Sequence, residues 1–362
     1  MRKIWKTAGA SLVLAAACAA AAMRLPALSA SEGALFAAGF ALPNGTVHAL
    51  LQPAGEDGTR SQQSAAAPSQ APASSQTASS EAAVSAASST PPAATSSTPA
   101  VTQRVADTDL GDQILETDIS ENGTRQGDIY VSNKNTYHSL DVAQVLSETP
   151  PLDIRLDGTP MVLLYHTHTT EAYAGVTRTR DPSQNVVAVG DAVAKSLEAA
   201  GIGVIHDTTI HDDPVFSGSY TRSAQTMEKN LKQYPTIQVT LDIHRDTMTT
   251  SSGTRYKPTV IVNGKKACQI MIISGCDDDG TLGFPNWEEN LRLAVRLQQG
   301  AAELFPNLMR PLNFSPNRYN EQMTPGSLLV EFGTEVNTLD EAVYGGELFG
   351  QVLAQELKKL AQ

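Results

Sequence analysis

Two histidines and a glutamate in this 362-residue chain have the types and spacing of a metal site. His168 and Glu171 are three residues apart, so on a turn or first helical step their side chains can point the same way. With the distant His244 they form a His₂Glu set, which catalytic zinc sites combine with an open position for water. Imidazole and carboxylate ligands without a thiolate favour Zn²⁺ over Mg²⁺ or an iron–sulfur cluster.

Glu331 is the candidate general base. Bound zinc lowers the pKa of its water to about 7, and a nearby carboxylate can take the proton and return it to a leaving amine. The order of the residues, an early HxxE, a distant His and then a distant Glu, follows the logic of the zinc carboxypeptidases. The pattern therefore predicts amide hydrolysis, unless Glu331 is the structural partner of a buried arginine.

The neighbouring polar residues leave alternatives open. His166 is either a substrate-orienting residue or the metal ligand in place of His168. Glu171 could instead cap a helix. Arg245 and Asp246 either pair with each other, or Asp246 orients a metal-bound imidazole.

A second group of polar residues follows a predicted strand. His206 and His211 flank a loop that contains Asp207, Asp212 and Asp213. We interpret this segment as a solvated acidic loop, with a substrate-binding rim as the alternative.

The elements that position these residues alternate between strands and helices. Apolar runs predict strands at 161–165, 202–205, 237–243 and 327–331, and helical periodicity predicts helices at 186–200, 221–234, 286–305 and 338–360. Ser219 is a candidate cap for the second helix, and Thr338 with Glu341 forms a capping box for the last. The alternation predicts an α/β, three-layer fold with a mainly parallel sheet flanked by helices. Ligands bind such sheets outside the carboxyl ends of the strands, where the candidate residues lie.

The cysteines and one turn add detail. An Asn263-Gly264 turn between 260–262 and 268–273 predicts a hairpin. Cys268 and Cys276 lie in what reads as one strand, too far apart for a disulfide unless the chain bends, so we expect two separate thiols. The absence of a CxxC pattern argues against a cysteine zinc site.

The N-terminal part has the composition of an exported anchor and a tether. Arg2, Lys3 and Lys6 precede an uncharged stretch at 7–23, which favours a membrane anchor over a signal peptide cleaved near Ala30 or lipidation of Cys18. Residues 61–103, rich in Ser, Ala, Pro and Thr, cannot build a core. We predict a membrane anchor or signal segment at 1–30, an extracytoplasmic linker at 31–106 and a catalytic domain at 107–362, of which 107–158 is ambiguous.

The charge of the chain excludes some partners. The formal net charge is −12, and no basic stripe is present, so nucleic acid is not an expected partner. Substrate binding must come from a specific site rather than from bulk charge.

Four motifs carry a resemblance to a known family. YHTHTTEAY at 165–173, GSYTRS at 218–223, DIHRD at 242–246 and LVEFG at 329–333 closely resemble the stage II sporulation protein P family, in the same order. The resemblance runs from about residue 129 to the C-terminus. It implies a fold related to the zinc N-acetylmuramoyl-L-alanine amidases, and cleavage of the amide between muramic acid and the stem peptide, with endopeptidase activity on cross-links.

The resemblance also implies a cellular setting and site residues. It implies thinning of septal peptidoglycan during engulfment, with a lytic transglycosylase and a membrane recruiting protein as partners. The single-pass membrane anchor predicted from the N-terminal residues also fits that family. The family's metal and catalytic residues fall on a histidine and Glu171 of the first motif, on His244 and on Glu331. The wider amidases place a zinc glutamate at the start of the following helix, where this chain has Ser-Gln-Asn at 183–185, which favours Glu171.

Two rival functions remain. The pair His166-x-His168 fits the opening motif of an HxH metal-dependent phosphoesterase, although such sites need more His and Asp ligands. A catalytically silent wall-binding or scaffold protein is the other. Loss of activity on zinc removal separates an enzyme from a scaffold, and the metal count separates the two enzymes.

Overall fold

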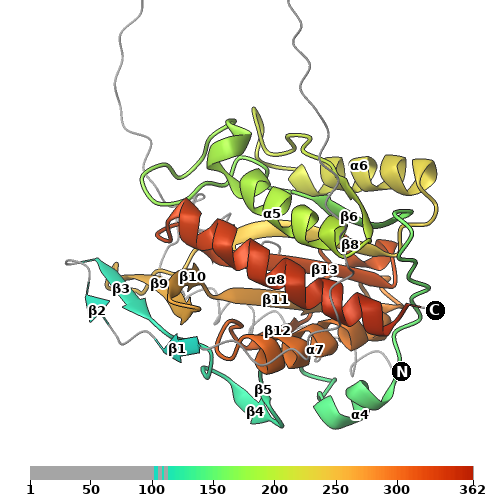
Figure 1. Cartoon of the computed structure of the whole chain (residues 1–362), viewed down its shortest axis with the longest axis horizontal. Coiled ribbons are helices and arrows are strands. Elements are labelled where there is room, and N and C mark those ends of the chain that lie inside the picture. Colours follow the sequence, from blue (N-terminus) through green and yellow to red (C-terminus); the bar gives the residue numbers. More distant parts are fainter. Residues whose placement is uncertain (1–101, 105–107, 110–112, 362) are drawn as a thin grey trace, which may run out of the picture. The chain divides into compact units, whose positions relative to one another are not determined.

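The computed structural model of the chain describes residues 102–104, 108–109 and 113–361 (Figure 1). These residues belong to a compact unit, Ser97–Gln362. None of the described helices is long and apolar enough to cross a membrane. The predicted N-terminal segment at 1–30 lies outside the described residues, as does the predicted linker at 31–106 apart from residues 102–104.

The main sheet has eight strands in the order β4-β5-β12-β11-β13-β8-β6-β7. The β4–β5 and β11–β13 pairs are antiparallel and the other five pairs are parallel, so the prediction of a mainly parallel sheet is confirmed. Along the chain, the strands are β4 Thr124–Gln126, β5 Ile129–Asn133, β6 Pro160–Tyr165, β7 Gly203–His206, β8 Val239–Asp246, β11 Ile270–Gly275, β12 Leu312–Ser315 and β13 Gly326–Thr334.

Helices flank this sheet, which confirms the predicted α/β class. Helix α8 lies between α5 and α7 across the sheet (Figure 1). Helix α6 packs on β6 through Met227, which contacts Leu163 and Tyr165. The helices are α4 Val142–Ser147, α5 Val186–Ala199, α6 Ser219–Gln233, α7 Trp287–Leu304 and α8 Leu339–Lys359, with short 3₁₀ turns at Pro182–Gln184 and Glu321–Met323.

The alternation of residues along the central strands decides which side chains face which helices. Successive side chains of a strand point to opposite faces. In β8, Leu241 and Ile243 join the core cluster that contains the α5 and α8 residues. Asp242 is opposite Tyr165 in the register and therefore lies on the face that α6 covers, as does His244 two residues later. The polar residues of β8 thus share the α6 face of the sheet.

The helix ends follow local capping rules. Thr338 and Glu341 form the predicted capping box at the start of α8, with the Glu341 N–H donating to Thr338 Oγ1 at 3.2 Å. Helix α6 differs from the prediction, because Ser219 is its first residue rather than its cap. Gly218 takes the cap position with φ 81°, a conformation that glycine adopts without a steric penalty.

A second, smaller sheet has the order β1-β9-β3-β2, with β10 also paired to β9. Asn263 and Gly264 have positive φ in the turn between β9 and β10, so the predicted hairpin is confirmed. The prediction of one strand over 268–273 is wrong, because Gln269 separates β10 from β11. The strands are β1 Thr102–Arg104, β2 Thr108–Asp109, β3 Ile114–Thr117, β9 Arg255–Val262 and β10 Lys265–Cys268.

Two details concern the predicted segments. Cys268 and Cys276 are free and buried, which confirms two separate thiols. Residues 102–104, which composition assigned to the linker, pair with β9. The ambiguous segment 107–158 contributes buried Ile129 and Val131 to the main core, so it is part of the fold.

Candidate functional site

His168, Glu171 and His244 come together on the α6 face of the sheet. Strand β6 ends at Tyr165 and is followed by a turn. In this turn the Glu171 N–H donates to the His168 carbonyl at 3.0 Å. Glu171 Oε2 lies 3.4 Å from His244 Nδ1. The rings of His168 and His244 are 5.2 Å apart and nearly perpendicular. The turn thus delivers two of the predicted metal ligands to the third.

Glu331 lies on the neighbouring strand directly beside this group. Strand β13 runs parallel to β8, and the register pairs Glu331 with His244. Burial, with the nearby carboxylate of Asp246, raises the pKa of Glu331 to about 8. Its Oε2 is buried without a hydrogen-bond partner. A carboxyl group held this way is suited to exchange protons near neutral pH.

His166 points to the other side of the sheet. Its Nδ1 contacts the Ile243 carbonyl at 3.0 Å, and its Nε2 contacts His206 Nε2 at 2.8 Å. His206 in turn contacts Asp191 at 2.9 Å. Burial, together with His206, lowers the pKa of His166 to about 3, so the ring is neutral. Of the two alternatives for the first histidine, the structure therefore places His168 and not His166 in the site.

Asp242 is a site residue that the sequence analysis missed. It is fully buried, and its carboxylate accepts the Thr167 N–H at 2.7 Å and the Thr167 hydroxyl at 2.6 Å. Oδ1 also lies 2.9 Å from His244 Nε2. Two positions apart in a strand, Asp242 and His244 share a face, and that spacing is the signal that could have identified Asp242.

The charges around His244 favour a cation. Burial alone lowers the pKa of His244, but Asp242 and Glu171 outweigh it and hold that pKa well above its usual value. Burial raises the pKa of Glu171, yet His244 and Arg245 bring it down to about 2. The Asp242 and Glu171 carboxylates thus both face the His244 ring in a buried place. Burial lowers the pKa of His168 to about 4, so its ring keeps a free lone pair.

The unpartnered atoms of the site test whether a metal ion fits. His168 Nδ1 is buried with no hydrogen-bond partner, and the His244 nitrogen that faces Glu171 is Nδ1, because Nε2 lies against Asp242. Buried polar atoms in folded proteins are nearly always paired, so such groups call for an explanation. Two imidazoles and a carboxylate without sulfur match the ligand preference of zinc. The ligand types therefore suit a zinc ion, whereas the described residues whose ligand atoms all lie within 4.8 Å of one another are His138, Cys276 and Asp278.

Arg245 and Asp246 have separate partners. The Arg245 guanidinium donates to the carbonyls of Ala172 at 2.9 Å and Thr177 at 3.1 Å. The Arg245 backbone N–H donates to Glu171 Oε2 at 3.1 Å. Asp246 instead pairs with Arg310 at 2.8 Å. The interpretation that their side chains pair with each other is wrong, and Asp242 rather than Asp246 lies against the His244 ring.

The loop after β7 is largely buried at its centre. His211 is 2% exposed and contacts the His166 carbonyl at 2.7 Å. Asp212 accepts the Thr170 hydroxyl at 2.8 Å and pairs with Arg178 at 2.8 Å. The interpretation of a solvated acidic loop is therefore wrong for these two residues. They hold the 166–171 turn in place.

Aromatic side chains line one side of His168. Phe216 stacks on its ring at 4.4 Å, and Tyr220 meets it edge-on at 5.6 Å. Tyr319 lies next to Tyr220, with ring centroids 5.7 Å apart. Tyr319 and Asn320 both have positive φ, and Asn320 is held by its amide, which donates to the Tyr220 carbonyl at 2.9 Å. The GSYTRS motif thus contributes Tyr220 to this wall, and Phe216 and Tyr319 come from outside the motif.

The comparison with protein families decides the membership. The family described as stage II sporulation protein P (SpoIIP) matches residues 57–354. The chain belongs to the stage II sporulation protein P family. Within this family, the protein is 28% identical to the stage II sporulation protein P of Bacillus subtilis over 199 residues. That match covers 50% of this chain and 47% of the relative, so the chain spans about half the length of the curated relative.

Two solved amidases are similar to this SpoIIP family member. The N-acetylmuramoyl-L-alanine amidase AmiC2 of Nostoc punctiforme has 12% identity and a TM-score of 0.37, and the similarity covers 56% of this chain and 97% of that structure. The CwlD amidase of Clostridioides difficile, in complex with the GerS lipoprotein, has 12% identity and a TM-score of 0.34, with 55% and 98% covered.

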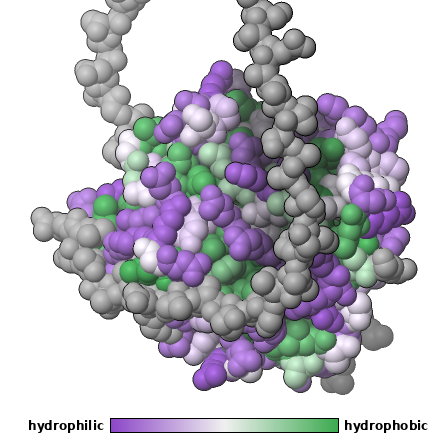
Figure 2. Space-filling view, viewed as in Figure 1, coloured by the Kyte–Doolittle hydropathy of each residue, from purple (hydrophilic) through white to green (hydrophobic). Residues whose placement is uncertain are grey.

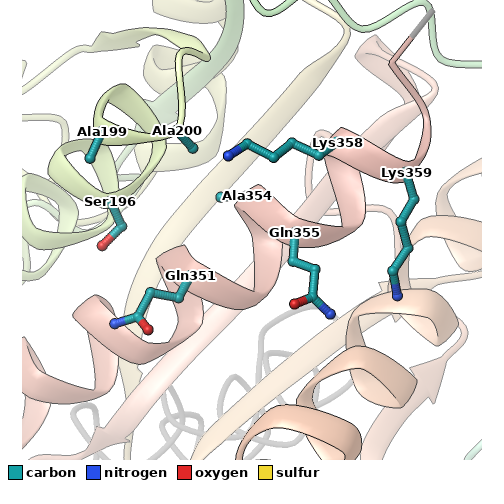
Figure 3. Close-up of a pocket in the computed structure, with 8 residues that line it drawn as sticks. All are labelled: Ser196, Ala199, Ala200, Gln351, Ala354, Gln355, Lys358 and Lys359. Atoms are coloured by element: carbon teal, nitrogen blue, oxygen red, sulfur yellow. The ribbon is translucent and has the colours of Figure 1, made fainter. Parts of the chain in front are cut away.

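A cavity of about 540 Å³ in this family member lies away from the polar site. It opens between α5 and α8, and Figure 3 shows Ala199, Ala200 and Ala354 with Lys358 at its wall. On that face of the molecule, Figure 2 shows hydrophilic residues interspersed with smaller hydrophobic areas. No residue of the predicted site lines this cavity, so its size does not identify the site of chemistry.

Proposed function

We propose that this protein is a zinc-dependent peptidoglycan hydrolase that cleaves the amide between N-acetylmuramic acid and the stem peptide. The observation that carries the proposal is the buried group of His168, Glu171 and His244, with His168 Nδ1 unpartnered and with Glu331 beside the group. Membership of the SpoIIP family supports it, because peptidoglycan is the substrate that the resemblance implies. A cross-link endopeptidase activity at the same site is a second outcome of the same chemistry.

Each residue has a defined role in this proposal. His168, Glu171 and His244 would hold the ion, which when bound supplies Lewis acidity toward a carbonyl oxygen and a water molecule. Glu331 takes a proton from water and returns it to the leaving amide nitrogen. Asp242 holds the His244 ring through its Oδ1, 2.9 Å from Nε2. Tyr220 and Tyr319 offer partly exposed rings on which substrate can pack.

The first experiment digests purified peptidoglycan with the full-length protein and analyses the products by mass spectrometry. The expected products are stem peptides free of muramic acid. Glu331→Gln is expected to lower the rate about 10²- to 10⁴-fold, because the general base is lost. Chelation is expected to abolish the activity and added zinc to restore it. Glu347→Gln, an exposed glutamate on α8, is the matched control and keeps the wild-type rate.

The possible products separate the competing functions. Peptides cut within a cross-link assign an endopeptidase. If the peptidoglycan stays uncleaved while the protein still binds it, the enzyme proposal is wrong and a scaffold role is favoured. The phosphoesterase alternative requires His166 and His168 to bind metal in one site. The two side chains lie on opposite faces of the sheet, which argues against it.

The proposal includes a cellular setting. The protein is a single-pass membrane protein with its catalytic domain outside the cytoplasmic membrane, in complex with a lytic transglycosylase and a membrane recruiting protein. Arg2, Lys3 and Lys6 before the uncharged stretch 7–23 support this orientation. Protease added to intact protoplasts should digest the catalytic domain, and a protected domain would contradict the orientation.

A further inference from the structure

A second group of metal-ligand side chains lies at another edge of the main sheet. Strands β5, β12 and β11 are parallel, so their carboxyl ends meet. Cys276 and Asp278 follow β11 directly, and His138 lies in the loop after β5. The crevice outside the carboxyl ends of parallel strands is a common place for ligands.

The three side chains bring together a nitrogen, a sulfur and an oxygen. One ligand atom from each lies within 4.8 Å of the other two. Cys276 is fully buried, Asp278 is 8% exposed and His138 is partly exposed, so an ion has a route from solvent. His138 Nδ1 and Asp278 Oδ1 are 3.2 Å apart. Two ligands of a tetrahedral zinc ion, each about 2.0 Å from it, are about 3.3 Å apart.

Surrounding groups hold the ligands in place. The Asp278 carboxylate accepts the backbone N–H groups of Thr136 at 2.7 Å, Tyr137 at 2.9 Å and His138 at 3.1 Å. Trp287 meets the His138 ring edge-on at 4.8 Å. Partners of this kind orient ligands in metal sites.

The charge around the sulfur is negative. The carboxylates of Asp278, Asp277 and Glu288 lie near the buried Cys276 sulfur. A divalent ion offsets that charge.

We propose that His138, Cys276 and Asp278 bind a second transition-metal ion of the zinc type, which fastens the loop after β5 to the loop after β11. Binding transfers the thiol proton to water, and the thiolate lone pair forms the bond to the ion, with a water completing the four-coordinate shell. The absence of a CxxC spacing does not conflict with this site, because the fold rather than the local sequence brings its ligands together.

The competing interpretation is that Asp278 only anchors the 136–138 loop. Its hydrogen bonds to three backbone N–H groups are sufficient for that role. In this case Cys276 is an inert buried thiol and takes no part in metal binding. The two interpretations differ in whether a metal–sulfur bond forms.

The experiment titrates the metal-free full-length protein with Co²⁺ and follows the sulfur-to-cobalt charge-transfer band in the near ultraviolet. The site of His168, Glu171 and His244 contains no sulfur, so the band reports on the second site whether or not the proposed hydrolase activity exists. The wild-type protein is expected to develop the band, with an intensity that corresponds to one thiolate-bound Co²⁺ ion per protein molecule. Cys276→Ser and His138→Gln are expected to lose it.

Cys268→Ser is the matched control, because Cys268 is also a buried free thiol but lies in the smaller sheet. It is expected to keep the band. An absent band in the wild-type protein, which requires no variant to fold, overturns the proposal. A band that survives Cys276→Ser in a protein with a native circular dichroism spectrum also overturns it.

Discussion

At the scale of single residues, Asp242 decides how His244 is presented. The carboxylate is fully buried, receives two hydrogen bonds from Thr167 and lies against the His244 ring. It acts through a proposed metal ligand, so it is a positioning residue. Outer partners of metal-bound histidines typically contribute a factor of about 10 to 100 in metal affinity.

Asp242→Asn should therefore weaken zinc binding about 10- to 100-fold. It should also lower the pKa of His244, because the negative charge that favours the imidazolium is removed. Competition with a chromogenic chelator measures the affinity, and histidine NMR of the metal-free protein measures the pKa. Asp191→Asn is the control, since Asp191 contacts His206 in the other histidine pair. Equal losses in both variants would contradict the role of Asp242.

Glu331 gives a second prediction, for the stability of the metal-free protein. Burial raises its folded-state pKa to about 8, above the ordinary value of 4.5. The native state then binds this proton more tightly than the unfolded state, so stability falls as the pH rises from 4.5 to about 8. Glu331→Gln removes that loss and should stabilise the metal-free protein at pH 8 by about 1–3 kcal/mol, with little difference at pH 4.

Urea denaturation with a chelator present measures this difference at the two pH values. Glu347→Gln, at an exposed position, should change stability equally little at both. A Glu331→Gln protein that is less stable than the wild type at pH 8 would show that the carboxylate has a favourable partner in the fold.

The choice between His166 and His168 illustrates what sequence could and could not predict. In a continuous strand, residues two apart share a face. The strand ends at Tyr165, and the following turn sends the two rings to opposite sides of the sheet. The spacing of the two histidines in the sequence does not predict that turn. The Asp246–Arg310 ion pair could not be predicted from the sequence either, because it joins residues that are 64 positions apart.

At the scale of elements, the strongly periodic segments were predictable. Helices α5, α7 and α8 and strands β6, β8 and β13 follow their apolar patterns within a few residues. Strand β12 was missed, because its four residues are too few to show alternation and its pairing with β5 joins distant parts of the chain. Helix α4 was missed because its six residues are also too few to show a helical pattern.

The contact between α5 and α8 supports a prediction at this scale. Replacing glycine by alanine inside a helix is normally favourable by about 1 kcal/mol. A Cβ at Gly350 would lie 2.6 Å from Ser196 Cβ and 3.0 Å from the Val193 carbonyl oxygen. Gly350→Ala should therefore destabilise the protein by about 1–3 kcal/mol, measured by thermal or urea denaturation.

A second variant tests the physical reason. Adding Ser196→Gly to Gly350→Ala removes the closest clash and should restore part of the lost stability. If Gly350→Ala alone stabilises the protein, the two helices are further apart than the structure shows.

At the scale of the whole molecule, charged residues join the smaller sheet to the main layer. Lys257 on β9 pairs with Glu341 on α8 at 2.8 Å and lies 3.9 Å from Glu116 on β3. Lys266 on β10 also pairs with Glu116. Nearby, Lys265 Nζ lies 4.2 Å from the centre of the Tyr344 ring of α8. Figure 1 shows this sheet at one end of the molecule, beside α8.

Glu116, whose charged partners lie within the smaller sheet, makes that sheet sensitive to pH. Burial alone raises its pKa, but hydrogen bonds from Lys266 and Thr259 and the charge of Lys257 bring the net value below 4.5. Because the pKa of Glu116 is lower in the folded state than in the unfolded state, its ionised carboxylate stabilises the fold at pH values above the unfolded-state pKa. This contribution is lost as the pH falls through the folded-state pKa. Glu116→Gln should cost about 1–3 kcal/mol at pH 7 and much less at pH 3, measured by urea denaturation. The exposed variant Glu347→Gln should show no such dependence, and an equal loss at both pH values would mean that shape rather than charge decides the contribution of Glu116 to the smaller sheet.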